Sequence, residues 1–248
     1  MKLRYYILLG VFSLLFFLIA LFPADLAWKM VPKSVTASLP LRVEQVGGTL
    51  WDGYAVAKSF SGPVKGQHVF AWNLNPLWLF LADLNAGLRV EGSDYKASGT
   101  AHFGLTGKGV SGLNGQVRAD LVNALLNQFG AQASGELLLK DVTLEFGSGT
   151  DVSQATGLIS WGGGPVSYRD GRRTQNIDVP GIKGTLTQQD GGLLLSVVES
   201  TSNAALGELT LKGPIGGVVV YKRVMRVAGL SNPADEDAVL VQLQRPIM

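Results

Sequence analysis

The sequence predicts a mainly β protein, with a single N-terminal transmembrane helix followed by one antiparallel, curved or sandwich-like β domain that has one or two short helices. Three observations predict this class. Residues 5–22 form one uncharged apolar run. From Leu39 onward, apolar and polar residues alternate in short runs, which is typical of strands that bury one face. Glycine-rich turn signals separate these runs at the spacing expected for antiparallel neighbours.

The apolar run is long enough to act as a membrane anchor. A helix over it would be about 27 Å long at about 1.5 Å per residue, and the hydrocarbon core of a bilayer is roughly 30 Å thick. A cleavable signal peptide is the alternative, but its apolar region is shorter and small residues mark its cleavage site. For a cut after Ala24, the bulky Phe22 occupies a position that should be small. The pattern therefore favours an uncleaved anchor.

Charges beside the anchor predict its orientation. Lys2 and Arg4 precede the apolar run, and basic residues stay on the cytoplasmic side of a membrane. The expected location is the cell inner membrane, single-pass, with the N-terminus cytoplasmic. The predicted parts are a cytoplasmic tip (1–4), a transmembrane anchor (5–22), a linker (23–38) and a periplasmic β-rich domain (39–248).

Strands and two short helices are predicted in this domain. Asn75 and Pro76 are typical of a helix start, so a helix is expected over residues 75–81. Residues 120–130 begin with an aspartate, repeat apolar residues at helical spacing and end with a glycine, which predicts a second helix. We expect these helices to cover a sheet edge or cap an open core. Alternating runs occupy residues 41–44, 84–90, 97–105, 137–146, 193–197, 209–211, 218–220 and 238–243.

Composition excludes several classes of protein. The chain contains no cysteine, which excludes disulfide scaffolds, iron–sulfur clusters and thiol nucleophiles. The formal net charge of +2 comes from Lys2 and Arg4, because the remaining basic and acidic residues are equal in number. A nucleic-acid binder needs an excess of basic residues, so we expect no nucleic-acid partner.

No motif predicts a catalytic, cofactor-binding or metal site. Residues 107–112 match G-x-G-x-x-G, but turn-like residues follow where a phosphate-binding loop needs a helix. His68 and His102 lie in strand-like runs, with no pattern that places a nucleophile and a carboxylate beside them. We therefore expect no enzymatic activity and no cofactor. One minor alternative is a membrane-anchored hydrolase that uses the S-x-x-K pair of Ser93 and Lys96, testable with an acylating probe.

Three segments carry a resemblance to a known family. Residues 46–53 read Val-Gly-Gly-Thr-Leu-Trp-Asp-Gly, similar to a G-T-L-W-x-G signature. Residues 71–79 place a tryptophan before an apolar segment, and residues 155–161 resemble a G-x-(I/L)-x-W element. From the anchor to roughly Leu211, the chain resembles the type II secretion system protein N family. The candidate motif or contact residues are Gly48, Leu50, Trp51, Gly53, Trp72, Gly157 and Trp161, and core packing is the alternative role of the three tryptophans.

The resemblance implies a non-catalytic, bitopic inner-membrane subunit of the type II (general) secretion machinery, which assists export of folded proteins across the outer membrane. The implied partners are other inner-membrane or periplasmic subunits, contacted through strand edges or exposed apolar faces. The alternative is an AsmA-like protein whose apolar groove binds or transfers lipid at the inner membrane. An open apolar trough would favour lipid handling, and a closed core would favour a structural subunit.

Overall fold

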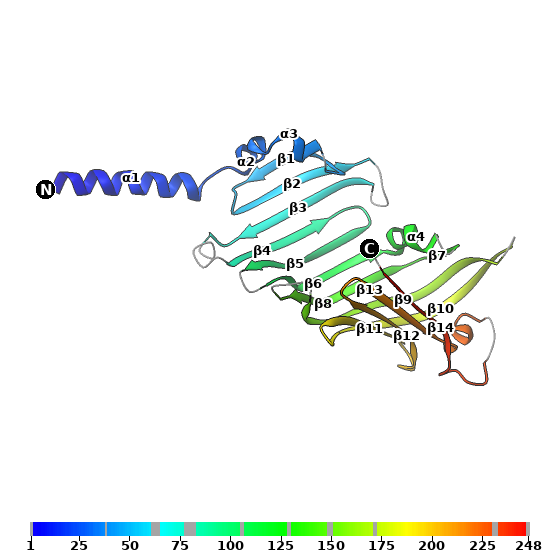
Figure 1. The fold of residues 1–248 in the computed structure, drawn as a ribbon. Helices are drawn as coiled ribbons and strands as arrows, with labels where there is room; N and C mark the ends of the chain where they lie inside the picture. The colour runs from blue at the N-terminus through cyan, green and yellow to red at the C-terminus, as the bar shows by residue number, and fades with distance from the viewer. Residues whose placement is uncertain are drawn as a thin grey trace. The chain divides into compact units, whose positions relative to one another are not determined.

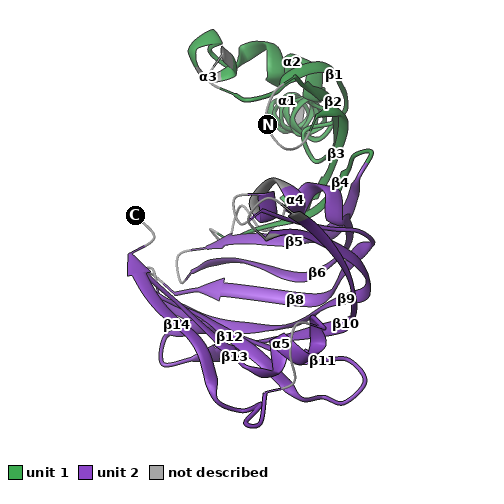
Figure 2. Cartoon of the chain, turned by 90° about the vertical axis from the view of Figure 1, so that its right-hand side faces the viewer, with its two compact units in different colours: residues 1–93 green, residues 94–248 purple. Residues whose placement is uncertain are grey.

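The computed structural model describes residues 2–37, 39–60, 65–76, 83–104, 107–127, 130–147, 151–170, 173–229 and 233–246. These residues form antiparallel β-sheet with a few short helices, so the predicted mainly β class is confirmed (Figure 1). The chain divides into two compact units, residues 1–93 and 94–248 (Figure 2). The sequence had predicted a single β-rich domain over residues 39–248.

Unit 1 is an antiparallel meander preceded by helices. Each strand pairs with the next in the order β1-β2-β3-β4, and a bulge lies between Val43 and Gln45 of the first strand. Its buried residues include Ala57 and His68, which face each other across neighbouring strands. The elements are α1 (Lys2–Ala20), α2 (Ala24–Met30), α3 (Lys33–Ala37), β1 (Arg42–Gly48), β2 (Asp52–Ser59), β3 (Gly66–Leu74) and β4 (Asp83–Glu91).

Helix α1 corrects one part of the predicted fold class. Within the described ranges, no helix combines the length and the apolar character needed to cross a membrane. The predicted transmembrane helix over residues 5–22 is therefore not found there. The helix ends at Ala20, short of the predicted end, because Pro23 disfavours helical geometry in the residue before it.

The segment predicted as a linker, residues 23–38, contains two short helices. Pro23 precedes the first turn of α2, and Asp25 and Lys29 form an ion pair of 3.1 Å one turn apart. This pair is a stabilising arrangement within a helix. Helix α2 packs against β1, and Figure 1 shows α2 and α3 beside that edge of the unit 1 sheet.

Unit 2 is a strongly curved antiparallel sheet (Figure 2). Its strand order is β5-β6-β8-β9-β10-β11-β12-β13-β14, and β7 pairs with β9 off this path. The elements are β5 (Tyr95–Gly104), β6 (Lys108–Arg118), α4 (Ala119–Leu126), β7 (Ala131–Ala133), β8 (Glu136–Phe146), β9 (Val152–Asp170), β10 (Arg173–Gln189), β11 (Gly192–Glu199), β12 (Ala205–Lys212), β13 (Ile215–Tyr221), α5 (Arg223–Val227) and β14 (Val239–Pro246).

The predicted helices had different outcomes. Helix α4 confirms the prediction for residues 120–130, although it begins at Ala119 and ends at Leu126. Of the helix predicted over residues 75–81, residues 77–81 lie outside the described part of the chain. The sequence did not predict α5, which spans five residues and carries no capping side chain.

One face of the unit 2 sheet is predominantly apolar. Residues that pair directly across antiparallel strands share a face, and Trp161 pairs with both Leu137 and Ile182. We call this side the inner face. Part of it forms a core around Val152, Ala155 and Leu186. Partly buried residues packed against that core are Val142, Leu144, Phe146, Leu193 and Leu195.

Candidate functional site

The turn between β1 and β2 contains the first family-like motif. Gly48 has a φ of +84°, and a Cβ there would lie 2.5 Å from the Asp52 carbonyl oxygen. The Thr49 amide donates to that same oxygen at 2.8 Å, and the Asp52 amide donates to the Thr49 hydroxyl oxygen at 3.0 Å. At Gly53, a Cβ would lie 2.6 Å from the Trp72 ring. Both glycines are therefore required by the shape of the turn.

The indole groups of two tryptophans connect this turn to neighbouring elements through hydrogen bonds. Trp51 Nε1 donates to the Ile19 carbonyl at 2.9 Å, and Trp72 Nε1 donates to the Leu50 carbonyl at 3.0 Å. The Leu50 amide donates to the Phe22 carbonyl at 2.9 Å. The Ile19 carbonyl, in the last turn of α1, also accepts a hydrogen bond from the Phe22 amide at 3.2 Å. The motif thus connects the end of α1 to β1, β2 and β3.

The structure brings together five of the seven predicted residues and leaves two elsewhere. Those that meet in unit 1 are Gly48, Leu50, Trp51, Gly53 and Trp72. Gly157 and Trp161 lie on β9 in unit 2. Trp161 is only 7% exposed and donates from Nε1 to the Ser134 carbonyl at 2.8 Å. Gly157 has a φ of +143°, and a Cβ there would lie 2.6 Å from Val142 Cα.

Unit 2 contains an apolar cavity of about 580 Å³. Helices α4 and α5 and the strands from β7 to β13 contribute to its wall, and no polar atom is exposed on that wall. Most of the lining side chains are valine, leucine, isoleucine and alanine. They include Val122, Leu126, Leu137, Trp161, Ile182, Val197, Leu209, Val218, Val220, Val224 and Val227.

Of the residues that line this cavity, only Trp161 was among the candidate residues predicted from the sequence. Signals for others were present, because Ala119, Val122 and Leu126 recur at helical spacing on α4. The same spacing relates Val224, Val227 and Ala228 on and after α5. Neither pattern predicts that the two helices lie over the same face of the sheet.

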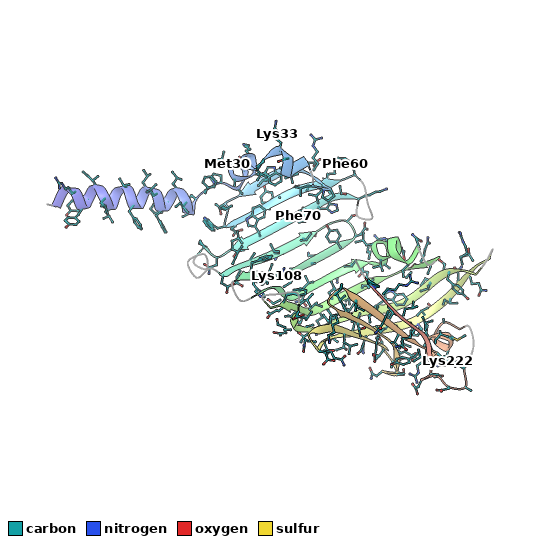
Figure 3. All side chains as sticks on the ribbon, in the orientation of Figure 1. Met30, Lys33, Phe60, Phe70, Lys108 and Lys222 are labelled. Carbon is teal, nitrogen blue, oxygen red and sulfur yellow. The ribbon has the colours of Figure 1, made fainter. Side chains whose placement is uncertain are left out.

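A second hollow, of about 760 Å³, lies in unit 1 beside α2 and α3. Lys29, Lys33 and Arg42 line it together with Trp28 and Phe60, and no acidic residue does so within the described ranges. Figure 3 shows Lys33 and Phe60 at this end of the unit. We call this hollow the basic cleft. Lys29 is paired with Asp25, so it is the charge of Lys33 and Arg42 that favours an anionic or acidic binding partner.

Ion pairs between arginines of α5 and nearby acidic residues hold this helix beside the apolar cavity. Arg223 contacts Glu236 at 2.9 Å and Asp237 at 2.7 Å, and these contacts raise the pKa of the Arg223 guanidinium. Arg226 contacts Glu236 at 2.8 Å and Glu199 at 3.4 Å. The Ser202 hydroxyl, donating at 2.6 Å, is the largest cause that lowers the pKa of Glu199, and Arg226 adds to it. These charges hold the helix in place.

The described residues do not assemble an evident catalytic centre. Residues 108–112 of the G-x-G-x-x-G match lie in β6 rather than before a helix. Ser93 lies in a bend and Lys96 in β5, whereas the serine of the S-x-x-K enzymes opens a helix. Across the described ranges, no group of three or more histidine, cysteine, aspartate or glutamate side chains could hold a metal ion.

Comparison with known families decides the assignment. The family model described as type II secretion system (T2SS), protein N, matches residues 40–229. The chain belongs to the type II secretion system protein N family. The match in this protein N member includes the β1–β2 turn and all residues that line the apolar cavity, but neither α1 nor β14. No curated protein and no solved structure was found to match the chain.

Proposed function

We propose that this protein N member is a non-catalytic, bitopic inner-membrane subunit of the type II secretion machinery. It assists export of folded proteins across the outer membrane through protein contacts of its periplasmic part. The observation that carries the proposal is the family match over residues 40–229.

The amino-terminal helix supports the membrane location. From Tyr5 to Ile19, the side chains of α1 include thirteen large hydrophobic residues that are more than half accessible. Such a surface favours contact with lipid or protein over water. Lys2 and Arg4 favour a cytoplasmic N-terminus. Protease treatment of spheroplasts would test this orientation, since sites after residue 38 should be cleaved while those in an N-terminal epitope tag should be protected.

Two surfaces suit contacts with other subunits. Among the described strands, β14 pairs with β13 alone, so its second edge is open to a partner strand. All eight residues of β14 are exposed. The basic cleft of unit 1 suits an acidic segment of a partner, since Lys33 and Arg42 line it. Neither surface requires catalysis.

Secretion measurements and crosslinking test the proposal together. Deleting the gene should leave secreted proteins in the periplasm, and the wild-type chain should restore their release. A photoreactive amino acid at Leu240 of β14 should crosslink to a secretion subunit. The matched control is Leu158 on β9, a strand that is paired on both sides. The exposed fraction of the side chain is 41% for Leu240 and 45% for Leu158. Normal secretion without the gene would contradict the proposal.

A second candidate function is the binding or transfer of lipid at the inner membrane. The wholly apolar cavity of unit 2 is the observation that favours it, because an exposed apolar wall commonly marks a ligand or interaction site. Phospholipid that copurifies with the full chain in native mass spectrometry would support this function. Secretion that is normal in the absence of the gene would leave lipid binding as the stronger candidate.

A further inference from the structure

We infer that the apolar cavity of unit 2 holds one acyl chain of a membrane phospholipid, while Arg245 on β14 binds the phosphate of the same molecule. The inference deepens the second candidate function and rests on the placement of the protein at a membrane. It assigns a site, a ligand class and a direction of access.

The apolar wall of the cavity determines which kind of ligand can bind there. Its volume of about 580 Å³ lies within the range of small-molecule sites, roughly 300–1,000 Å³. Because no polar atom is exposed on the wall, a peptide main chain inside would lose hydrogen bonds to water without replacing them. An acyl chain has no such groups and gains from leaving water.

A row of apolar residues leads from the cavity to the edge of the sheet. Leu195, Leu209, Val218 and Leu243 lie directly opposite one another on β11, β12, β13 and β14. Leu209 and Val218 line the cavity, whereas Leu243 lies outside it and is 50% exposed. Neighbouring strands are about 4.8 Å apart, so the row extends roughly 10 Å from Leu209 to Leu243. This row offers an acyl chain a continuous apolar path.

The same path ends beside a cation. Arg245 follows Leu243 by two residues on β14, so both side chains project from the inner face. Arg245 is exposed, and no ion pair to it is described. A guanidinium group binds phosphate oxygens with two parallel hydrogen bonds. An apolar path with a cation at its outer end matches the two parts of a phospholipid.

The other nearby arginines are already engaged. Arg223 and Arg226 on α5 pair with Glu199, Glu236 and Asp237 at 2.7–3.4 Å. Their charge is therefore balanced within the protein. Arg245 lies on the inner face beside the apolar row. Among the described contacts of β12 to β14 it has no ion pair, so its charge is available to a ligand.

Photocrosslinking in vesicles tests the inference on the full chain. The probe is a phosphatidylglycerol with a diazirine in one acyl chain, mixed into vesicles that contain the purified protein. Adducts located by peptide mass spectrometry should fall on β12, β13 and α5. Leu209→Trp fills the cavity and should lower these adducts several-fold. Leu158→Trp makes the same change on the outer face at a similar exposure and should not.

Further variants separate the two parts of the site. Leu209→Gln should also lower the adducts, and circular dichroism checks that each variant folds. Arg245→Gln should lower labelling by the phosphatidylglycerol probe, but not by a neutral diacylglycerol carrying the same diazirine. Adducts confined to α1, labelling unchanged in both Leu209 variants, or a secretion subunit found in the cavity would overturn the inference. Because secretion is measured separately, a wild-type chain that takes no label from the lipid probe in its cavity but still forms normal partner crosslinks would overturn this inference alone.

Discussion

Single residues of the family motif act through hydrogen bonds and close approach rather than through reactive groups. The Trp51 indole caps a carbonyl of α1, and the Trp72 indole caps the turn that contains Leu50. Core packing, the alternative role, describes Trp161 well, since it is almost fully buried. Trp51 and Trp72 are only partly buried, so their hydrogen bonds distinguish them from ordinary core residues.

Trp51→Phe should weaken the connection between α1 and the β1–β2 turn. The change removes the hydrogen bond to the Ile19 carbonyl, which should lower the free energy of unfolding by about 1 kcal/mol. Denaturant unfolding of the full chain in micelles measures this loss. Trp28→Phe is the matched control, because no hydrogen bond of the Trp28 indole is described. Equal stability of the two variants would contradict the assigned role of Trp51.

Gly157→Ala should destabilise unit 2 through its backbone. The positive φ and the 2.6 Å approach of a Cβ to Val142 Cα leave no room for alanine without a shift of β8 or β9. A cost of about 1–3 kcal/mol is expected for a strained backbone position. Gly162→Ala on the same strand meets no atom within 4 Å and serves as the control. A thermal midpoint that falls equally in both variants would argue against a special role of Gly157.

At the scale of elements, the strands were more predictable than their arrangement. Alternation located β8, β11 and β14 because each strand has one apolar face. Helix α5 was missed because its five residues give only one repeat of the helical spacing, which is a weak signal. The cavity depends on register, and register is set by pairings such as Leu209 with Val218 across strands. Bulges also shift the register, for example between Val197 and Val198 where β11 pairs with β12, and the sequence pattern does not reveal them.

The attachment of α5 should depend on pH through Glu199. The pKa of Glu199 in the folded chain lies below its ordinary value of 4.5, chiefly because of the Ser202 hydroxyl and then Arg226. A carboxyl group with a lowered pKa stabilises the fold above that ordinary value, and this stability is lost as pH falls through the folded pKa. The stability difference between the wild type and Glu199→Gln should therefore shrink on acidification.

Unfolding midpoints between about pH 7 and pH 3, which bracket the usual range for a glutamate, measure this difference. Ser202→Ala and Arg226→Gln should each reduce the pH dependence, because the hydroxyl and the guanidinium both lower the pKa of Glu199. A stability difference that stays constant over this range would contradict the assigned role of Glu199.

At the scale of the whole molecule, composition excluded several functions but did not identify the actual one. The balance of charge and the lack of cysteine excluded whole classes of site. The motif around Trp51 identified the family, which the match over residues 40–229 confirms. The basic cleft was not predicted, because Lys29, Lys33 and Arg42 come from three different elements. Only the fold brings their charges together in a chain whose net charge is small.

Reversing the charge of the basic cleft should reduce secretion without unfolding the chain. Lys33→Glu combined with Arg42→Glu removes two cations from the cleft and adds two anions, so an acidic partner segment would be repelled. Secreted protein in the medium should fall several-fold relative to the periplasm. The control, Lys108→Glu with Lys212→Glu, makes the same change of charge on unit 2, where neither residue lines the cleft, and should secrete normally. Equal loss in both double variants would show that net charge, and not the cleft, governs the effect.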